Sequence, residues 1–381
     1  MIEPMRDGYF RASDRGKAPA MIKVIGVGGG GCNTVRRMMR ARQIPGVEYV
    51  AANTDVKSLD LIQGALSVQI GEHMTHGFGA GGDPRVGSKA AQEGEFLLKR
   101  AVKDAEMVFI AVGMGGGTGT GAAPVVARIA KDSGAMVIAV VTTPFSFEGK
   151  KRTEVAYGGL QDLRTVVDNM IIIHNDKLLQ YAEHNTNISE AFKMADDVVC
   201  EGIVSVSQLV NVPGEINVDM ADVKRVMGIP GVTIMAIGQG QGSHPAMDAT
   251  EQAMTNPLVD VKMTGAKGLL VSFSGGPDLT LTEITEAGTM LSRECDPSCH
   301  FKFGLATLSE ELRGKAKVTL IATGIKAINP AYATTGVATA PSHSPSQQPS
   351  SPAQSAATTA RGWLSGLGKR LNDAGSSNRR Y

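Results

Sequence analysis

The segment from residue 113 to 121 constrains this chain most, because it reads Gly-Met-Gly-Gly-Gly-Thr-Gly-Thr-Gly. It follows the apolar run 107–112 and precedes the helix-forming stretch 122–130, so it is predicted to connect a strand to a helix. Backbone without Cβ atoms can approach a polyanion closely, and its N–H groups and the two threonine hydroxyls can surround phosphate oxygens. The segment therefore favours a phosphate-binding loop over an ordinary βα connection.

A second glycine loop, at residues 26–31, also follows a predicted strand. It satisfies G-x-G-x-x-G, and Asp55 ends the next strand, which together would fit a dinucleotide site. Two observations weigh against a dinucleotide site. The pyrophosphate of a dinucleotide needs only one glycine loop, so the loop at 113–121 would have no role. The pair Cys32-Asn33 is also polar, where close packing of the helix on the sheet prefers small apolar residues. Two glycine loops at adjacent strand ends instead suggest a mononucleotide with a full triphosphate. Residues 82–89 are a near miss for a P-loop, with Ser and Lys in the wrong order.

Composition limits the class of protein. The chain has 381 residues, enough for two domains plus tails, and its 42% hydrophobic and 20% charged residues are typical of a soluble globular protein. The net charge of +1 gives no basic field for nucleic acid, so no nucleic-acid partner is expected. Residues 1–20 contain no apolar signal region, no apolar run approaches the ~18 residues of a membrane span, and the four cysteines suggest reduced thiols. A cytoplasmic protein is expected.

The apolar pattern predicts two α/β units. In the first, strands are expected at Ile22–Val27, Tyr49–Asn53, Met107–Val112, Met136–Thr142 and Met170–His174, and the continuous apolar runs favour a parallel sheet covered on both faces. A long helix is expected from Ile188 to Val210. In the second unit, strands are expected at Val232–Ile237, Gly268–Ser274 and Val318–Gly324, with helices near Met220–Met227, Pro245–Thr255 and Leu281–Arg293.

These motifs together resemble the FtsZ family within the tubulin/FtsZ GTPases. The signature loop (residues 113–121) looks like the loop of that superfamily, and the resemblance extends over about 22–325. Further matching stretches are Ile25–Gly31, Asn53-Thr-Asp55, Pro144–Arg152, Asn175–Leu178 and Asn217–Val223. The resemblance implies a Rossmann-like three-layer GTPase domain joined by a long central helix to a smaller α/β domain. The expected segments are an N-terminal extension (1–20), a GTP-binding domain (21–187), the central helix (188–210), an activating domain (211–328), a linker (329–360) and a basic tail (361–381).

The resemblance implies a nucleotide site built from three loops. The first glycine loop and Asn33 would line the α/β-phosphates and the base side, residues 80–82 would form the γ-phosphate loop, and the signature loop would complete the cradle. Glu148 and Arg152 correspond to ribose and phosphate contacts, although Glu148 could instead be a solvated charge in a turn. The implied nucleotide-binding residues are Gly28, Gly29, Gly30, Asn33, Ala80, Gly81, Gly82, Gly115, Gly116, Gly117, Thr118, Gly119, Glu148, Arg152, Asn175, Phe192 and Asp197.

Guanine differs from adenine in its N1–H and N2 donors and its O6 acceptor. A carboxylate can accept both donors and an amide can meet the acceptor, and Asp197 and Asn175 match the family's base-reading positions. Phe192 could stack on the base or could be a core residue of the long helix. Asp196 stands where asparagine is common in relatives, and it could alter affinity or simply face solvent.

Hydrolysis requires an oriented water and a hard cation, so Mg²⁺ is expected with GTP. Asp219 and Asp222 lie three residues apart at a predicted helix start and can share one face. They could simply cap the helix and interact with its dipole. The resemblance implies instead that Asn217, Asp219 and Asp222 reach the nucleotide of a neighbouring subunit. Such a contact is heterologous and does not close, so it generates filaments, and hydrolysis would depend on assembly.

The C-terminal segments depart from the family, whose tail usually ends in a short acidic, proline-containing apolar peptide that docks onto membrane-tethering partners. Residues 331–360 contain no charged residue and indicate a linker. Residues 361–381 carry five Lys/Arg and one Asp, net +4. Within them, Trp363, Leu364, Leu367 and Leu371 fall on one helical stripe beside Lys369 and Arg370. This tail could contact an anionic membrane, bind a membrane-tethering division protein, or be disordered with accidental apolar residues.

The predicted function is that of a GTP-hydrolysing, filament-forming protein of the bacterial cytokinetic ring, placed at the division site on the inner face of the membrane. One alternative is a related paralogue that binds GTP and assembles with little turnover or in a specialised role. Another is a nicotinamide-linked oxidoreductase, which the signature loop disfavours. Cys295, Cys299 and His300 resemble metal-ligand spacing, but zinc needs four ligands and no second pair accompanies them.

Overall fold

The computed structural model describes residues 20–41, 44–180, 182, 186–212, 214, 216–256 and 263–326. The predicted N-terminal extension (except Ala20), the linker and the basic tail therefore lie outside the described residues. Within the described ranges, no helix has the length and apolar character needed to cross a membrane.

The strands form one mixed ten-stranded sheet in the order β3-β2-β1-β4-β5-β6-β7-β10-β8-β9. The first six strands pair in parallel. They are β1 (Ile22–Val27), β2 (Val47–Asn53), β3 (Leu66–Gln69), β4 (Met107–Gly113), β5 (Met136–Thr143) and β6 (Asn169–His174). Their central members are buried along their length because helices cover both faces.

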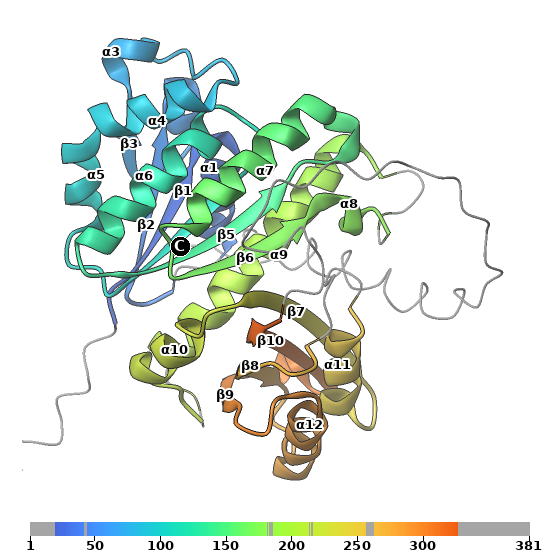
Figure 1. Cartoon of the computed structure of the whole chain (residues 1–381). Coiled ribbons are helices and arrows are strands. Elements are labelled where there is room, and N and C mark those ends of the chain that lie inside the picture. Colours follow the sequence, from blue (N-terminus) through green and yellow to red (C-terminus); the bar gives the residue numbers. More distant parts are fainter. Residues whose placement is uncertain are drawn as a thin grey trace, which may run out of the picture.

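Two helical layers enclose this parallel half (Figure 1). The N-terminal helices are α1 (Gly28–Ala41), α2 (Val56–Asp60), α3 (Glu72–Thr75), α4 (Pro84–Glu93), α5 (Glu95–Val102), α6 (Thr118–Asp132), α7 (Lys150–Arg164), α8 (Asn175–Leu178) and α9 (Ile188–Asn211), with a 3₁₀ turn at Ser146–Glu148. Helices α1 and α9 share a core with one face of the sheet, and α4 to α7 share a core with the other.

The second half of the chain adds four strands and three helices. These are α10 (Met220–Met227), β7 (Val232–Gln241), α11 (Pro245–Met254), β8 (Gly268–Gly275), α12 (Leu281–Glu294), β9 (His300–Leu308) and β10 (Lys315–Ile325), with a 3₁₀ turn at Glu310–Leu312. Strand β10 is antiparallel to β7 and β8, whereas β9 runs parallel to β8. One paired position, Ile171 with Thr233, joins β6 to β7. On one face of the sheet each half has its own core, whereas on the face covered by α9 a single core runs through both halves.

Helix α9 connects the halves. Asn187 and Glu190 form a capping box at its start, and its apolar side chains pack both on α1 and on strands of the second half. A Cβ on Gly202 would lie 2.2 Å from Met235 Sδ, so glycine permits the close approach of α9 to β7. Polar contacts continue this packing, because Lys317 of β10 pairs with Glu201 and Thr319 hydrogen-bonds Ser205 at 3.0 Å.

The predicted fold class is confirmed, and the eight predicted strands are present with ends shifted by up to a few residues. Two strands were missed. Strand β3 is a short edge strand whose first two residues are exposed, so it has no continuous apolar run. Strand β9 alternates charged and aromatic residues around Lys302, which hides a half-buried strand from a search for apolar runs.

Candidate active site

The two glycine loops meet at one edge of the sheet. Strands β1 and β4 are parallel neighbours, so the loops that follow them emerge side by side and open α1 and α6. A Cβ on Gly28, whose φ is +69°, would lie 2.6 Å from the backbone nitrogen of Gly119. The two loops therefore touch through bare backbone, which explains their shared dependence on glycine.

A cradle open to a ligand lies along these loops. Ideal Cβ atoms on Gly29, Gly81, Gly82 and Gly116 would meet no atom within 4 Å. The first turns of α1 and α6 contain no acidic residue, so two helix N-termini present uncompensated N–H groups there. This arrangement fits a polyanion.

The expected γ-phosphate loop lies directly against the signature loop. A Cβ on Gly117 would come within 2.8 Å of the Asp83 nitrogen and 2.9 Å of Ala80 Cβ. On α4, a Cβ on Gly87 would lie 2.3 Å from the Gly117 carbonyl oxygen. Residues 80–82 are thus held beside residues 115–119 by backbone contact.

The two threonines of the signature loop already have partners. The Thr120 hydroxyl accepts the Gly115 N–H at 2.9 Å and braces the loop internally. The Thr118 hydroxyl lies 2.6 Å from that of Thr54. The Thr120 side chain is buried and closes the turn from within.

Glu148 and Arg152 form an ion pair with a 3.0 Å Nε–Oε2 distance at the start of α7. The Glu148 side chain is 8% exposed and also accepts the Phe145 N–H at 2.8 Å, so it is not a solvated turn charge. A Cβ on Gly115 would lie 2.7 Å from Arg152 Cγ, which places Arg152 against the signature loop.

Asn175 and Phe192 frame the expected base side. Asn175 is buried, and its Oδ1 has no hydrogen-bond partner, so this side chain has unused hydrogen-bonding capacity. Because amide orientation is assigned from the hydrogen-bond network, this position can equally present Nδ2, the donor that guanine O6 requires. Phe192 is 38% exposed and has edge-to-face contacts with Phe145 at 5.2 Å and with Phe147 at 6.4 Å between ring centroids, so it is a partly exposed member of an aromatic cluster.

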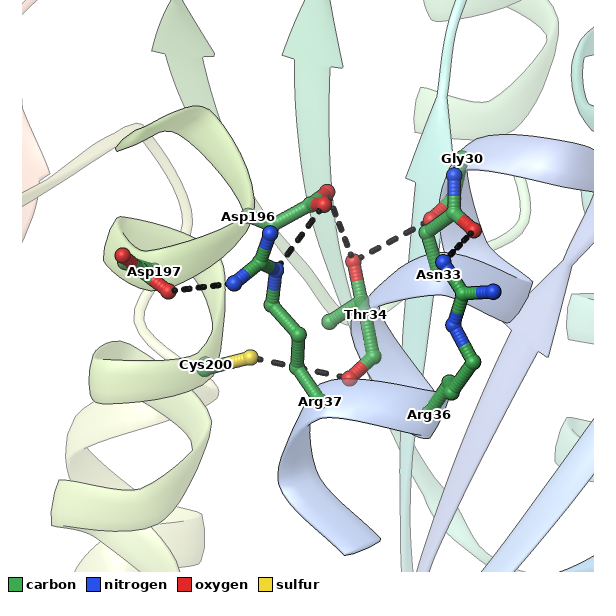
Figure 2. A network of polar contacts seen from close by, with 8 residues as sticks. All are labelled: Gly30, Asn33, Thr34, Arg36, Arg37, Asp196, Asp197 and Cys200. Atoms are coloured by element: carbon green, nitrogen blue, oxygen red, sulfur yellow. Dashed lines mark hydrogen bonds and ion pairs between the residues drawn. The ribbon is translucent and has the colours of Figure 1, made fainter. Parts of the chain in front are cut away.

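Arg37 joins the two adjacent carboxylates of α9 to α1 (Figure 2). Its Nε donates to Asp196 Oδ2 at 3.2 Å and its Nη1 to Asp197 Oδ1 at 3.3 Å. Thr34 Oγ1 lies 3.5 Å from Asp196 Oδ1. Burial raises the pKa of Asp196 to about 6 against the opposing effect of Arg37, and burial also raises the pKa of Asp197. Asp196 is therefore engaged by α1 and does not simply face solvent.

The activating loop (residues 216–222) is fixed by local and distant contacts. Asp219 caps α10 by accepting the Asp222 N–H at 2.7 Å, and Asn217 Oδ1 accepts the Gly214 N–H at 2.8 Å. Asp222 Oδ1 lies 3.0 Å from Lys302 Nζ on β9. The capping interpretation is thus confirmed for Asp219, while its own side chain remains exposed.

The base side and the activating loop belong to opposite ends of α9. Figure 1 shows α8 beside the start of α9 and α10 beyond its other end. A helix of 24 residues spans about 36 Å. Helix α8, which carries Asn175, therefore lies beside the start of α9, whose first ten residues include Phe192 and Asp197, whereas Asn217, Asp219 and Asp222 follow the other end of α9.

Sequence reasoning missed Arg37 and Lys302. Arg37 could have been found as a basic residue one helical turn after the glycine loop, whereas Lys302 lay in the unpredicted β9. Asp55 caps α2 through the Lys57 N–H at 3.1 Å, which accounts for the acidic residue of the dinucleotide pattern. Within the described part of the chain, no cluster of three or more His, Cys, Asp or Glu could hold a metal ion, and Cys295, Cys299 and His300 form none.

The fold and the paired glycine loops define a GTPase of the tubulin/FtsZ type. Residues 21–183 match the Tubulin/FtsZ family GTPase domain, and residues 231–326 match the FtsZ family C-terminal domain. The chain belongs to the FtsZ family, binds GTP and is a GTPase.

Solved structures agree with this assignment. An empty FtsZ dimer from M. jannaschii is 41% identical with a TM-score of 0.76, over 80% of this chain and 88% of that one. A mutant of M. jannaschii FtsZ is also 41% identical with a TM-score of 0.77, over 81% and 92%. CetZ2 from Haloferax volcanii, in a GTPγS-bound protofilament, shares the fold at 22% identity and a TM-score of 0.67, over 79% and 92%.

Proposed function

We propose that this chain is the self-assembling GTPase of the bacterial cytokinetic ring and that hydrolysis is completed between filament subunits. One observation carries the proposal: the base-side residues and the activating loop lie at opposite ends of α9. A head-to-tail contact would bring the activating loop of one subunit to the nucleotide of the next, and such a contact propagates into a filament. The FtsZ dimer of M. jannaschii supports association of this kind of chain.

The nucleotide would bind along the open glycine cradle. Gly28 to Gly30 and Asn33 would hold the α/β-phosphates, Ala80 to Gly82 the γ-phosphate, and Gly115 to Gly119 would complete the backbone donors. Arg152 would add charge beside the signature loop and Glu148 would contact the ribose. Asp197 would accept the guanine N1–H and N2 donors, Asn175 would meet O6, and Phe192 would stack on the base.

Mg²⁺ fits this site as a partner of the phosphates. It is commonly held by one or two carboxylates plus substrate phosphates and waters, so it would be bound chiefly by the phosphates of GTP, with Asp219 and Asp222 of the neighbouring subunit as the carboxylates within reach. When bound, the ion would neutralise charge developing on the γ-phosphate. Asp219 and Asp222 would orient and polarise the attacking water, and Asn217 would fix the loop that carries them.

The proposed domain division is a GTP-binding domain at 21–187, a central helix at 188–210 and an activating domain at 211–328, preceded by the extension 1–20 and followed by the linker 329–360 and the tail 361–381. The basic tail would recruit the filament to the division site, by direct contact with an anionic membrane or through membrane-tethering division proteins. The protein would act in the cytoplasm, on the inner face of the membrane.

The test is the dependence of turnover on protein concentration. GTPase rate per subunit should be near zero when dilute and rise above a critical concentration, together with light scattering. Asp222→Ala should bind GTP and assemble but lose turnover. A wild-type rate per subunit that does not change with concentration would contradict hydrolysis in trans, and assembly with negligible turnover would identify the paralogue alternative.

A further inference from the structure

Strand β9 anchors the activating loop at two places. The backbone N–H of Leu305 donates to the Ile216 carbonyl at 2.9 Å, just before the loop's functional residues. The Lys302 ammonium then pairs with Oδ1 of Asp222, the last of these residues, at 3.0 Å. The loop is therefore bounded by a backbone contact on one side and a side-chain contact on the other.

The side chains of β9 alternate between two faces of the sheet, and this alternation places Lys302 next to the activating loop. Phe301 and Phe303 stack at 6.1 Å between ring centroids and pack on the C-terminal core. Successive strand residues point to opposite faces, so Lys302 projects toward the face that α10 covers. Its side chain is 39% exposed and that of Asp222 is 26% exposed, so the pair lies at the rim of the domain rather than inside it.

The contact constrains one of the two carboxylate oxygens. Asp219 fixes the backbone of Asp222 through the helix cap, and Lys302 fixes its Oδ1. Among the described residues, no hydrogen bond or ion pair involves Asp222 Oδ2, so this oxygen can accept a hydrogen bond from a water molecule. The arrangement has the form of a base held by a third group.

The lysine also changes the charge that the loop presents. Without Lys302, the carboxylates of Asp219 and Asp222 would bring two negative charges toward the triphosphate of the neighbouring subunit, and the like charges would repel each other. An ammonium at hydrogen-bond distance from Asp222 offsets one of these charges where the loop would meet the neighbouring subunit.

We propose that Lys302 is a positioning residue for GTP hydrolysis: it holds the Asp222 carboxylate in the orientation needed to act on the neighbouring subunit's nucleotide and reduces the repulsion between them. This inference rests on the proposed hydrolysis in trans.

The experiment compares Lys302→Met, Lys302→Arg and the control Lys315→Met in full-length protein. Lys315 is an exposed lysine at the start of β10 in the same sheet. With Lys302→Met, kcat should fall at least about tenfold, because positioned bases contribute roughly 10²–10⁴-fold and misplacement forfeits part of this. The GTP concentration for half-maximal rate should stay within about twofold, since GTP binding does not depend on orienting water. The critical concentration for assembly should rise with Lys302→Met and not with Lys302→Arg, because the uncompensated Asp222 carboxylate then repels the neighbouring triphosphate.

The arginine variant shows whether the cation at position 302 acts on turnover or only supports the fold. Lys302→Arg keeps the cation and should retain most of kcat, and Lys315→Met should match wild type. If Lys302→Met does not assemble alone, it is mixed into wild-type filaments, where turnover should fall in proportion to its share.

Three results would overturn the inference: unchanged or faster turnover with Lys302→Met, equal loss with Lys302→Arg, or unchanged turnover in the mixed filaments. The two proposals fail differently. Wild-type turnover per subunit that is flat with concentration removes the trans mechanism and this inference together, whereas concentration-dependent wild-type turnover with an unaffected Lys302→Met removes only the role of Lys302.

Discussion

Arg37 and Asp197 form an ion pair with a 3.3 Å Nη1–Oδ1 distance, and this pair joins the helix after the first glycine loop to the central helix. The Asp197 side chain is 4% exposed and that of Arg37 is 27% exposed. The same guanidinium contacts Asp196, so one cation serves two carboxylates beside the expected base site (Figure 2). The electrostatic state of this site therefore depends on Arg37.

Replacing Arg37 by Met should destabilise the fold by about 3–5 kcal/mol at pH 8, because two largely buried carboxylates lose their shared cation. The loss should shrink toward pH 5.5, since the pKa of Asp196 is about 6 and its protonation removes one of the unpaired charges. Urea unfolding at both pH values measures this. Arg36→Met is the control, because Arg36 contacts the exposed Asn33 side chain, and it should change stability by less than about 0.5 kcal/mol. An equal Arg37→Met loss at both pH values would contradict the prediction.

Asp196 should give stability a specific pH dependence. Its pKa is raised from 3.8 to about 6 in the folded protein, so the folded state binds this proton more tightly than the unfolded chain. The contribution of Asp196 to the free energy of unfolding should therefore fall as pH rises from 3.8 to about 6 and stay constant above. Comparing wild type with Asp196→Asn between pH 4.5 and 8 isolates this effect, and the wild-type advantage should be larger at low pH. Parallel curves for the two proteins would show that Asp196 titrates normally.

Alanine substitutions at Gly116 and Gly121 should have different effects, the first on GTP binding and the second on the stability of the fold. A Cβ on Gly116 meets open space, so Gly116→Ala should fold with near wild-type stability yet lose at least about tenfold in GTP affinity, because the methyl group occupies the phosphate cradle. A Cβ on Gly121 would lie 1.8 Å from the Pro84 carbonyl oxygen, so Gly121→Ala should lose about 1–3 kcal/mol of stability. Equilibrium GTP binding and thermal unfolding of both variants test this. Full GTP affinity in a folded Gly116→Ala variant would argue against the cradle.

Asn175 should contribute to base selectivity. Asn175→Ala should reduce GTP affinity about tenfold or more and leave weak ATP binding unchanged, because the lost amide meets only guanine's O6. Competition binding with GTP and ATP measures the ratio. An equal loss for both nucleotides would mean that Asn175 supports the pocket without reading the base.

The sequence predicted those parts of the site whose signal is local. Runs of glycine after apolar strands identify the two loops, and Asp219 before an apolar helical stretch identifies the start of α10. Arg37 and Asp196 are 159 positions apart, and no local pattern couples them. Lys302 was missed for a related reason: a strand with alternating charged and aromatic residues is recognised only when its neighbours in the sheet are known. Glu148 is a further example. Its sequence context allowed either a nucleotide contact or a solvated charge in a turn, and only its burial in the structure argues against the solvated charge.

The contact between Gly87 of α4 and the Gly117 carbonyl has a mechanical consequence. Where side chains separate two segments, a change of rotamer can absorb a small shift of one relative to the other. Here main chain touches main chain, and no rotamer intervenes. If residues 80–82 hold the terminal phosphate as proposed, its departure is expected to shift α4 and the opening turn of α6 together, because no side chain separates Gly87 from the Gly117 carbonyl.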